Sequence, residues 1–286
     1  MTAESILLAL ACLLCAGLND FAFKLFARKS RPVGLYFSLI GVVWAGTFMA
    51  VAGRSLPERM NTAAAVWGVL SGLCSVTANI LLVRAMKKHE GGVCATVYRL
   101  NLVPAALLAF VFLGEHVTLG KLLGIGCAAG AVLLFYQPDA AKGSGLSRAA
   151  LMAVVSAALL RAGMGLFYKC GVSRGADELA ILVINGWFWV AGGLLYYAGA
   201  ERGTGAGFKG GVVRYGLISG ALVCGIVWFM ILALKHGDAS VVLPISQLSF
   251  VATALLGAAF LRERLTPRTI IGLALAILCV GLFGLA

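Results

Sequence analysis

The sequence predicts an all-α polytopic membrane protein with ten transmembrane helices in two inverted five-helix repeats. Three observations point to this fold class: an apolar composition, apolar runs of about 20 residues, which is the length that crosses a bilayer core, and an internal repeat. Of the 286 residues, 61% are hydrophobic and 12% are charged, whereas a soluble domain carries roughly 25% charged residues. So little polarity cannot cover a soluble surface, and we therefore expect the chain to lie in a lipid bilayer.

Ten apolar segments separated by short polar breaks are the expected spans. In chain order they cover residues 5–26, 34–53, 63–86, 93–114, 119–137, 148–172, 179–200, 211–234, 239–261 and 267–285. The first segment carries Asn19, Asp20 and Lys24 where a cleavable signal peptide would stay apolar, so we expect it to be retained. The polar stretch PDAAKGSGLSR begins at Pro138 and lies between the halves. We therefore assign the first repeat to 1–137, a linker to 138–147 and the second repeat to 148–286.

The repeat is clearest in the second part of each half. Residues 68–135 align without a gap on residues 216–283, with roughly 20 identities. Gly68 and Gly72 match Gly216 and Gly220, and such small-xxx-small pairs let helix backbones approach closely in lipid. The first helices match more weakly, through the lysines of FAFK and LFYK (residues 21–24 and 166–169). Because each half has an odd number of spans, the second half is inverted relative to the first, which is the architecture of alternating-access transporters.

A glutamate turn precedes the last helix of each half. Glu115 and Thr118 recur 148 positions later as Glu263 and Thr266. Thr266 followed by Pro267 is typical of a helix N-cap and first turn. We expect the two glutamates to place negative charge at the N-termini of the fifth and tenth helices, with a direct role in transport as the alternative.

These features resemble the EamA family of the drug/metabolite transporter superfamily over nearly the whole chain. The family has a Gly-x-Asn in its first helix with a lysine seven residues after the glycine, here Gly17, Asn19 and Lys24. Its Glu-x-x-Thr turns are those that begin at residues 115 and 263, and the proline of VVLPISQ also fits. The chain departs from the family at Ala16, where the family has tryptophan, and at Ala162, which replaces the glycine in the second half.

The resemblance implies solute transport, often export of amino acids or other small metabolites. It also implies a cavity lined by helices one to four and six to nine, with the fifth and tenth helices outside. As alternatives, the same fold serves multidrug or cationic-amine transport, and a non-transporting membrane scaffold or receptor is a third class.

The formal charge of +12 would suggest nucleic-acid binding in a soluble protein, but here basic loops that orient a membrane protein explain it. Five breaks between predicted spans carry 14 basic residues: Arg28, Lys29, Arg31, Arg84, Lys87, Lys88, Lys142, Arg148, Arg202, Lys209, Arg214, Arg262, Arg264 and Arg268. The other breaks carry 5: Arg54, Arg59, Lys121, Arg174 and Lys235. The positive-inside rule then places both termini on the non-cytoplasmic side of a bacterial-type inner membrane.

Charged groups inside the expected spans are candidate site residues because each costs about 2.5–3.5 kcal/mol in the membrane core. Arg99 lies in YRLN and its repeat counterpart Gln247 in SQLS, so that Tyr98 and Asn101 match Ser246 and Ser249. The guanidinium fork suits a carboxylate or phosphate. We predict that these two polar clusters face each other and bind substrate, while a structural Arg99 paired with Asp20 or with loop carbonyls remains the alternative.

Four further residues are weighed in the same way. Arg161, in ALLRAGMG, is a second candidate ligand for an anion. Asp20 and Lys24 lie four apart, so they form either an internal ion pair or, through Asp20, a proton-coupling site. Trp228 is the tryptophan we expect to wall the cavity. Four basic groups, Lys24, Arg99, Arg161 and Lys169, against the single acid Asp20 predict a cavity of net positive charge that carries a small anion or zwitterion, amino acids being the leading class.

Enzyme functions have little support. His89, His116 and His236 lie in short breaks without partners at ligand spacing, and Cys12 and Cys15 form a CxxC inside an apolar helix without nearby histidine. We expect no cofactor, no metal and no nucleic-acid partner. The expected partners are a small-molecule substrate, the lipid bilayer and, as a candidate coupling ion, the proton, in a monomer or homodimer.

Overall fold

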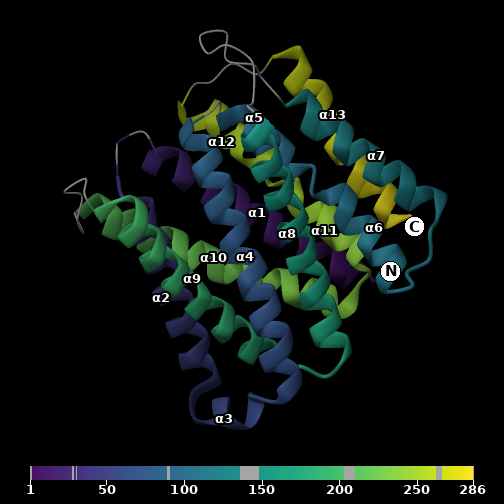
Figure 1. The fold of residues 1–286 in the computed structure, drawn as a ribbon. Coiled ribbons are helices and arrows are strands. Elements are labelled where there is room, and N and C mark those ends of the chain that lie inside the picture. The colour runs from purple at the N-terminus through teal and green to yellow at the C-terminus, as the bar shows by residue number, and fades with distance from the viewer. Residues whose placement is uncertain are drawn as a thin grey trace.

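The computed structural model describes residues 2–27, 29, 31–88, 91–135, 148–202, 210–261 and 266–285, and these residues are almost entirely helical. In chain order the helices are α1 (Ala3–Ala27), α2 (Val33–Ala52), a 3-10 turn η1 (Gly53–Ser55), α3 (Leu56–Arg59), α4 (Thr62–Lys88), α5 (Gly91–Arg99), α6 (Leu102–Phe112), α7 (Leu119–Leu134), α8 (Arg148–Ser173), α9 (Glu178–Ala200), α10 (Gly210–His236), α11 (Ala239–Gln247), α12 (Ser249–Leu261) and α13 (Pro267–Gly284). They form one bundle in which α7 and α13 lie side by side on the outside (Figure 1).

The predicted spans appear as helices. Eight helical segments in the described part of the chain are long and apolar enough to cross a membrane. Two shorter apolar helices, Thr96–Phe112 and Leu119–Leu134, lie where the sequence predicts the fourth and fifth spans. The all-helical, multi-pass architecture is therefore confirmed, and the number of ten crossings stays a prediction.

The fourth and ninth predicted spans are each interrupted near their middle. The fourth divides into α5 and α6 at Leu100, where the amide of Val103 bonds the Leu100 carbonyl. Pro104 accounts for this break because its ring has no N–H and its bulk displaces the carbonyl four residues earlier. The ninth divides into α11 and α12 at Leu248, whose amide bonds the Ile245 carbonyl in a 3-10 pattern. Arg99 is thus the last residue of α5, and its repeat counterpart Gln247 is the last residue of α11. The two interrupted spans therefore break at matching positions.

The two halves pack on each other through matched helices that run antiparallel. In α2 against α9, Gly34 lies beside Tyr197 and Gly41 lies beside Gly186 and Val190. Residue numbers rise along one helix as they fall along the other, so the halves are inverted. The backbones of α2 and α9 come very close at Gly41 and Gly186. A Cβ added to either glycine would lie less than 3 Å from backbone atoms of the other helix.

The glycines of the expected small-xxx-small pairs also lie at helix crossings. Each of them is contacted by a side chain of the neighbouring helix, and not by its backbone. Gly68 and Gly72 of α4 receive Ile184 and Phe188 of α9, respectively. In the other half, the matching Gly216 and Gly220 of α10 receive Leu39 and Val43 of α2. The outer pair repeats the device, since Gly124 of α7 meets Phe283 and Gly272 of α13 meets Phe135. One packing solution is therefore used twice, as a pseudo-two-fold relation between the halves requires.

The turns before α7 and α13 differ from the expectation in one respect. Thr118 and Thr266 do cap these helices, accepting bonds from the amides of Lys121 and Thr269. Glu115, however, does not serve α7. Its carboxylate accepts the amides of Ala239 and Ser240, at 2.6 and 2.9 Å, and so holds the start of α11. The matching Glu263 lies outside the described residues.

Candidate functional site

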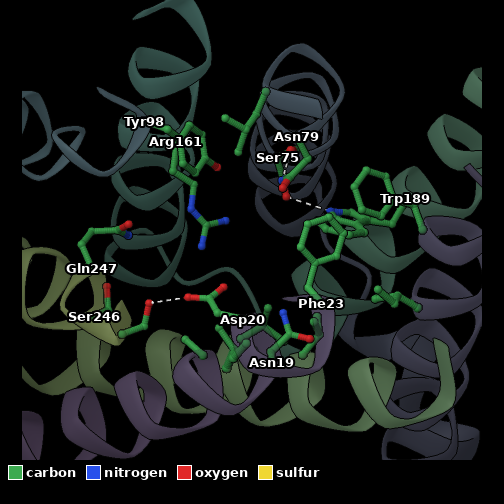
Figure 2. Close-up of a pocket in the computed structure, with 18 of the residues that line it drawn as sticks. Asn19, Asp20, Phe23, Ser75, Asn79, Tyr98, Arg161, Trp189, Ser246 and Gln247 are labelled. Atoms are coloured by element: carbon green, nitrogen blue, oxygen red, sulfur yellow. Dashed lines mark hydrogen bonds between the residues drawn. The ribbon is translucent and has the colours of Figure 1, made fainter. Parts of the chain in front are cut away.

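A cavity of about 360 Å³ lies in the middle of the bundle, where the two interrupted helices meet. Its wall comes from both halves, chiefly from α1, α2 and α4 of the first and from α8, α10, α11 and α12 of the second. From the centre it extends along α1 and α4 as far as Lys24 and Met86, near the C-terminal ends of both helices. Figure 2 shows polar side chains from α1, α5, α8 and α11 converging on this space.

The first charged feature of the cavity is an ion pair between Arg99 of α5 and Asp20 of α1. Arg99 donates to the Asp20 carboxylate at 2.6 Å, and the Ser249 hydroxyl donates to the same carboxylate oxygen at 2.9 Å. Arg99 also bonds the Ser249 hydroxyl at 2.8 Å and the Gln247 carbonyl at 3.3 Å, and its guanidinium lies over the Phe250 ring. These charge-assisted bonds satisfy a cation and an anion that neither helix could bury alone. The sequence alternative of a structural Arg99, paired to Asp20 and to a carbonyl, describes this geometry.

Arg161 is the second charged group, and its situation is different. It lies at the middle of α8, half-buried, with its guanidinium directed into the cavity (Figure 2). The hydrogen bond that the structure gives it is to the Met164 sulfur at 3.3 Å, which is a weak acceptor. Within the described residues no carboxylate lies within ion-pair distance of it. Most of its five N–H donors therefore remain available to a ligand.

Two buried polar atoms of the wall also lack a partner. The Asn19 side-chain oxygen accepts no hydrogen bond, and the Trp44 indole N–H donates none. Both residues line the cavity, from α1 and α2 respectively. Leaving such atoms unpaired costs about 1–3 kcal/mol each, so the wall holds a buried acceptor and a buried donor whose hydrogen bonds are unsatisfied.

Aromatic rings form the other side of the cavity. They are Phe23, Tyr36, Phe37, Trp44 and Trp189. Trp44 and Trp189 pack at 5.9 Å between ring centroids, and the Trp189 indole donates to the Ser75 hydroxyl at 2.8 Å. A ligand here would therefore meet charge on one side and a largely apolar surface on the other.

The sequence matches the EamA-like transporter family over residues 4–137 and again over residues 148–285. The chain belongs to the EamA-like transporter family. Comparison with curated proteins gave no match. A solved structure described as "Crystal structure of protein" resembles it over 100% of this chain and 98% of its own, with a TM-score of 0.81 and 14% sequence identity. That likeness concerns the fold, while the family match makes the chain a membrane transporter of the drug/metabolite superfamily.

Most of the residues proposed from sequence meet in the cavity of this EamA-like transporter. Those that line it are Asp20, Lys24, Tyr98, Arg99, Arg161, Ser246 and Gln247. Two lie elsewhere. Asn101 is buried behind the wall, where its amide donates to the Tyr98 carbonyl and to the Gln247 side-chain oxygen. Trp228 packs on Phe48 at 5.9 Å between ring centroids, outside the cavity wall.

The lysines and the ion pairing also differ from expectation. The structure pairs Asp20 with Arg99, which is 79 residues away in the sequence. The ion pair expected within one helix, between Asp20 and Lys24, is therefore not the pair that the structure shows. Lys169 lies away from the cavity and donates to the carbonyls of Leu234 and Gly237, both at 2.6 Å. The cavity wall then carries three basic side chains, Lys24, Arg99 and Arg161, against Asp20.

Sequence reasoning did not name Trp44, and it preferred Trp228 to Trp189 as a wall residue of the EamA-like transporter. An aromatic residue in an apolar helix reads equally well as core, interface or cavity wall. A usable signal did exist, because the two tryptophans lie at corresponding places in the second helix of each half. They are 145 residues apart, as are Lys24 and Lys169.

Proposed function

We propose that the protein is a secondary transporter that moves a small zwitterion or anion, with amino acids the leading class, across the membrane by alternating access. The observation that carries the proposal is Arg161, a cation at mid-bundle with no carboxylate partner in the described part of the chain. A buried cation is stabilised by an anion or by water. A substrate carboxylate would supply the anion with two charge-assisted hydrogen bonds.

The surrounding atoms favour a zwitterion with an apolar part. The unpaired Asn19 oxygen is an acceptor for a substrate ammonium group, and the unpaired Trp44 N–H is a further donor for the carboxylate. The ring surfaces of Phe23, Phe37 and Trp189 would cover an apolar side chain. Because Arg99 is bound to Asp20, we assign the carboxylate to Arg161 and give Arg99 the role of holding α1, α5 and α12 together.

The experiment is counterflow in liposomes with labelled amino acids, comparing the wild type with Arg161→Gln and Arg161→Lys. Loss of the guanidinium should lower counterflow at least tenfold, since a bond to a charged group contributes about 1.5–3 kcal/mol. Arg161→Lys keeps the charge without the planar fork and should recover only part of the rate. Arg148→Gln, an exposed change at the start of the same helix, is the matched control.

A counterflow rate in Arg161→Gln equal to that of the wild type would contradict the proposal that Arg161 binds the substrate carboxylate. Competition by quaternary amines and not by carboxylates would favour the cationic-amine alternative, and no exchange of any solute would favour a scaffold.

We further propose a bacterial-type inner membrane and net export, following the family resemblance. Uptake into everted vesicles tests the direction, since a protein that only imports would not fill them.

A further inference from the structure

A second hollow, of about 440 Å³, lies at the end of the bundle away from the end that the central cavity reaches. One of its wall residues, Arg174, lies over the Trp67 ring near the N-terminal end of α4, whereas the cavity reaches Met86 near the C-terminal end of the same helix. In the described part of the chain no residue lines both spaces. The hollow is therefore separate from the cavity in this conformation.

The internal repeat relates the hollow to the end of the cavity. Lys169 of α8 lines the hollow, and its repeat counterpart Lys24 of α1 lines the cavity. Asp238, also in the wall of the hollow, follows α10, and α10 is the helix that matches α4. Because the halves are inverted, these matching places lie at opposite ends of the bundle. A transporter that works by alternating access has an entry at each end, and the hollow lies where the second entry is expected.

Most of the charged groups in the hollow are already bonded to the protein. Glu115 accepts two backbone amides at the start of α11, at 2.6 and 2.9 Å. Asp238 forms an ion pair with Lys121 at 2.7 Å. Lys169 donates to two carbonyls at the C-terminal end of α10, both at 2.6 Å. These bonds leave one cation of the wall to account for.

That cation is Arg174, which is exposed just after α8. Its guanidinium carbon lies 4.8 Å from the centroid of the Trp67 ring, and within the described residues no carboxylate lies within ion-pair distance of it. Trp67 is itself held in place, since it packs on Gly171 and its ring lies 5.9 Å from that of Phe167. A guanidinium that rests on an aromatic face keeps its N–H edge available for a bidentate carboxylate. Arg174 thus repeats, at the end of the bundle, the chemistry of Arg161 in the cavity.

We propose that the hollow is a docking site for the solute at the second entry, where Arg174 binds the solute carboxylate. The carboxylates of Glu115 and Asp238 lie in the same wall and suit the ammonium group of a zwitterion, while Phe112 and Leu113 add apolar surface. The phosphate of an anionic lipid is the other source of anionic oxygens, but such a lipid has no cationic group to meet these acids. The inference rests on the proposed transport of a carboxylate-bearing solute and adds a second place where that solute binds.

Alkylation of Cys170, a half-buried residue of the hollow wall, tests the proposal on the purified full-length protein. N-ethylmaleimide is added with or without L-leucine or acetate, and mass spectrometry follows the modification of the peptide that carries Cys170. A rising ligand concentration should slow the modification at least about threefold, because the occupied fraction grows with the ratio of ligand concentration to dissociation constant. The slowing is measured as a ratio within each variant, so that an effect of a substitution on the thiol itself cancels. Ser173→Cys, at an exposed position of the same wall, supplies a second reporter thiol.

Four variants locate the protection. Arg174→Gln should abolish it, and Arg174→Lys should keep only part, because the charge remains without the planar fork. Arg161→Gln should protect as well as the wild type, since Arg161 lines the central cavity and not the hollow. Arg54→Gln removes an exposed cation from the connection between α2 and α4 and is the charge-matched control.

No slowing by leucine or acetate, or slowing that survives Arg174→Gln, would overturn the docking site. Loss of protection in Arg161→Gln would also overturn it, because the effect would then come from the central cavity. Protection by added phosphatidylglycerol and not by leucine or acetate would assign the hollow to a lipid headgroup instead. Protection by leucine in a protein without counterflow would keep the docking site and remove the proposed transport function, whereas wild-type counterflow without protection would do the reverse.

Discussion

Two arginines 62 positions apart in this chain illustrate what a single residue can reveal. Arg99 donates hydrogen bonds to Asp20, Ser249 and the Gln247 carbonyl, whereas the acceptor that the structure gives Arg161 is a sulfur. The sequence identifies both as costly intramembrane cations. It cannot separate them, because the partner of Arg99 lies on another helix and the pairing depends on how helices cross. The structure pairs the first arginine with Asp20 and gives the second no carboxylate among the described residues, which is why we propose the second as the ligand contact.

At this scale we predict that Arg99→Met lowers the free energy of unfolding by about 2 kcal/mol, because the Asp20 carboxylate loses its cation. Both side chains are partly exposed, at 20% and 34%, which keeps the loss below that of a fully buried pair. Thermal unfolding in detergent measures it. The double variant Asp20→Asn/Arg99→Met should recover at least half the loss, since no charge is then left unpaired. A single variant as stable as the wild type would show that the pair contributes nothing.

Helices in this bundle approach each other through glycines, and the sequence predicts this only in part. The pattern of Gly68, Gly72, Gly216 and Gly220 marks crossings, yet the closest backbone contact is at Gly41 and Gly186, which no spacing motif singles out. The reason is physical. A small residue is needed wherever two helices cross, and crossing points depend on helix tilt as well as on local sequence. The target of Glu115 escapes prediction for a similar reason, because it lies 124 residues away.

For the helix pair α2 and α9, we predict that Gly41→Ala destabilises the protein by about 1–3 kcal/mol. An added Cβ would stand 2.5 Å from the Val190 nitrogen and 2.8 Å from the Gly186 oxygen, and backbone atoms cannot turn aside. Gly46→Ala is the matched control on the same helix, because nothing lies within 4 Å of its Cβ position. Melting temperatures in detergent compare the two. Equal melting temperatures would mean that α2 and α9 can separate without loss.

For the whole molecule, composition and the internal repeat suffice to predict the helical, two-repeat fold, and the family match confirms it. The residues that meet in the cavity are predicted less completely. Charged groups stand out in apolar helices, so Asp20, Arg99 and Arg161 are found from sequence. Trp44 and Trp189, which also line it, are not singled out from sequence, because apolar wall residues look like any other part of a membrane helix.

The orientation of the molecule can be tested directly. From the excess of basic residues in alternate connections we predict that both termini face away from the cytoplasm. A reporter that is active only in the cytoplasm should therefore be inactive when fused after Ala286. The same reporter inserted within residues 203–209 should be active and serves as the internal control. Strong activity of the C-terminal fusion would reverse the assignment, and with it the side on which the cavity opens.

The repeat that builds the fold is broken where the cavity is charged. By the two offsets, Arg161 corresponds to Ala16, Asp20 to Gly165 and Arg99 to Gln247. Each of these three charged groups therefore corresponds to an uncharged residue in the other half, whereas Lys24 corresponds to another lysine. In a fully symmetric cavity, a solute could bind equally well in two poses related by the pseudo-two-fold axis. Here only one pose places an anionic group against Arg161. A solute that binds in that pose would keep the same orientation while the protein changes conformation around it.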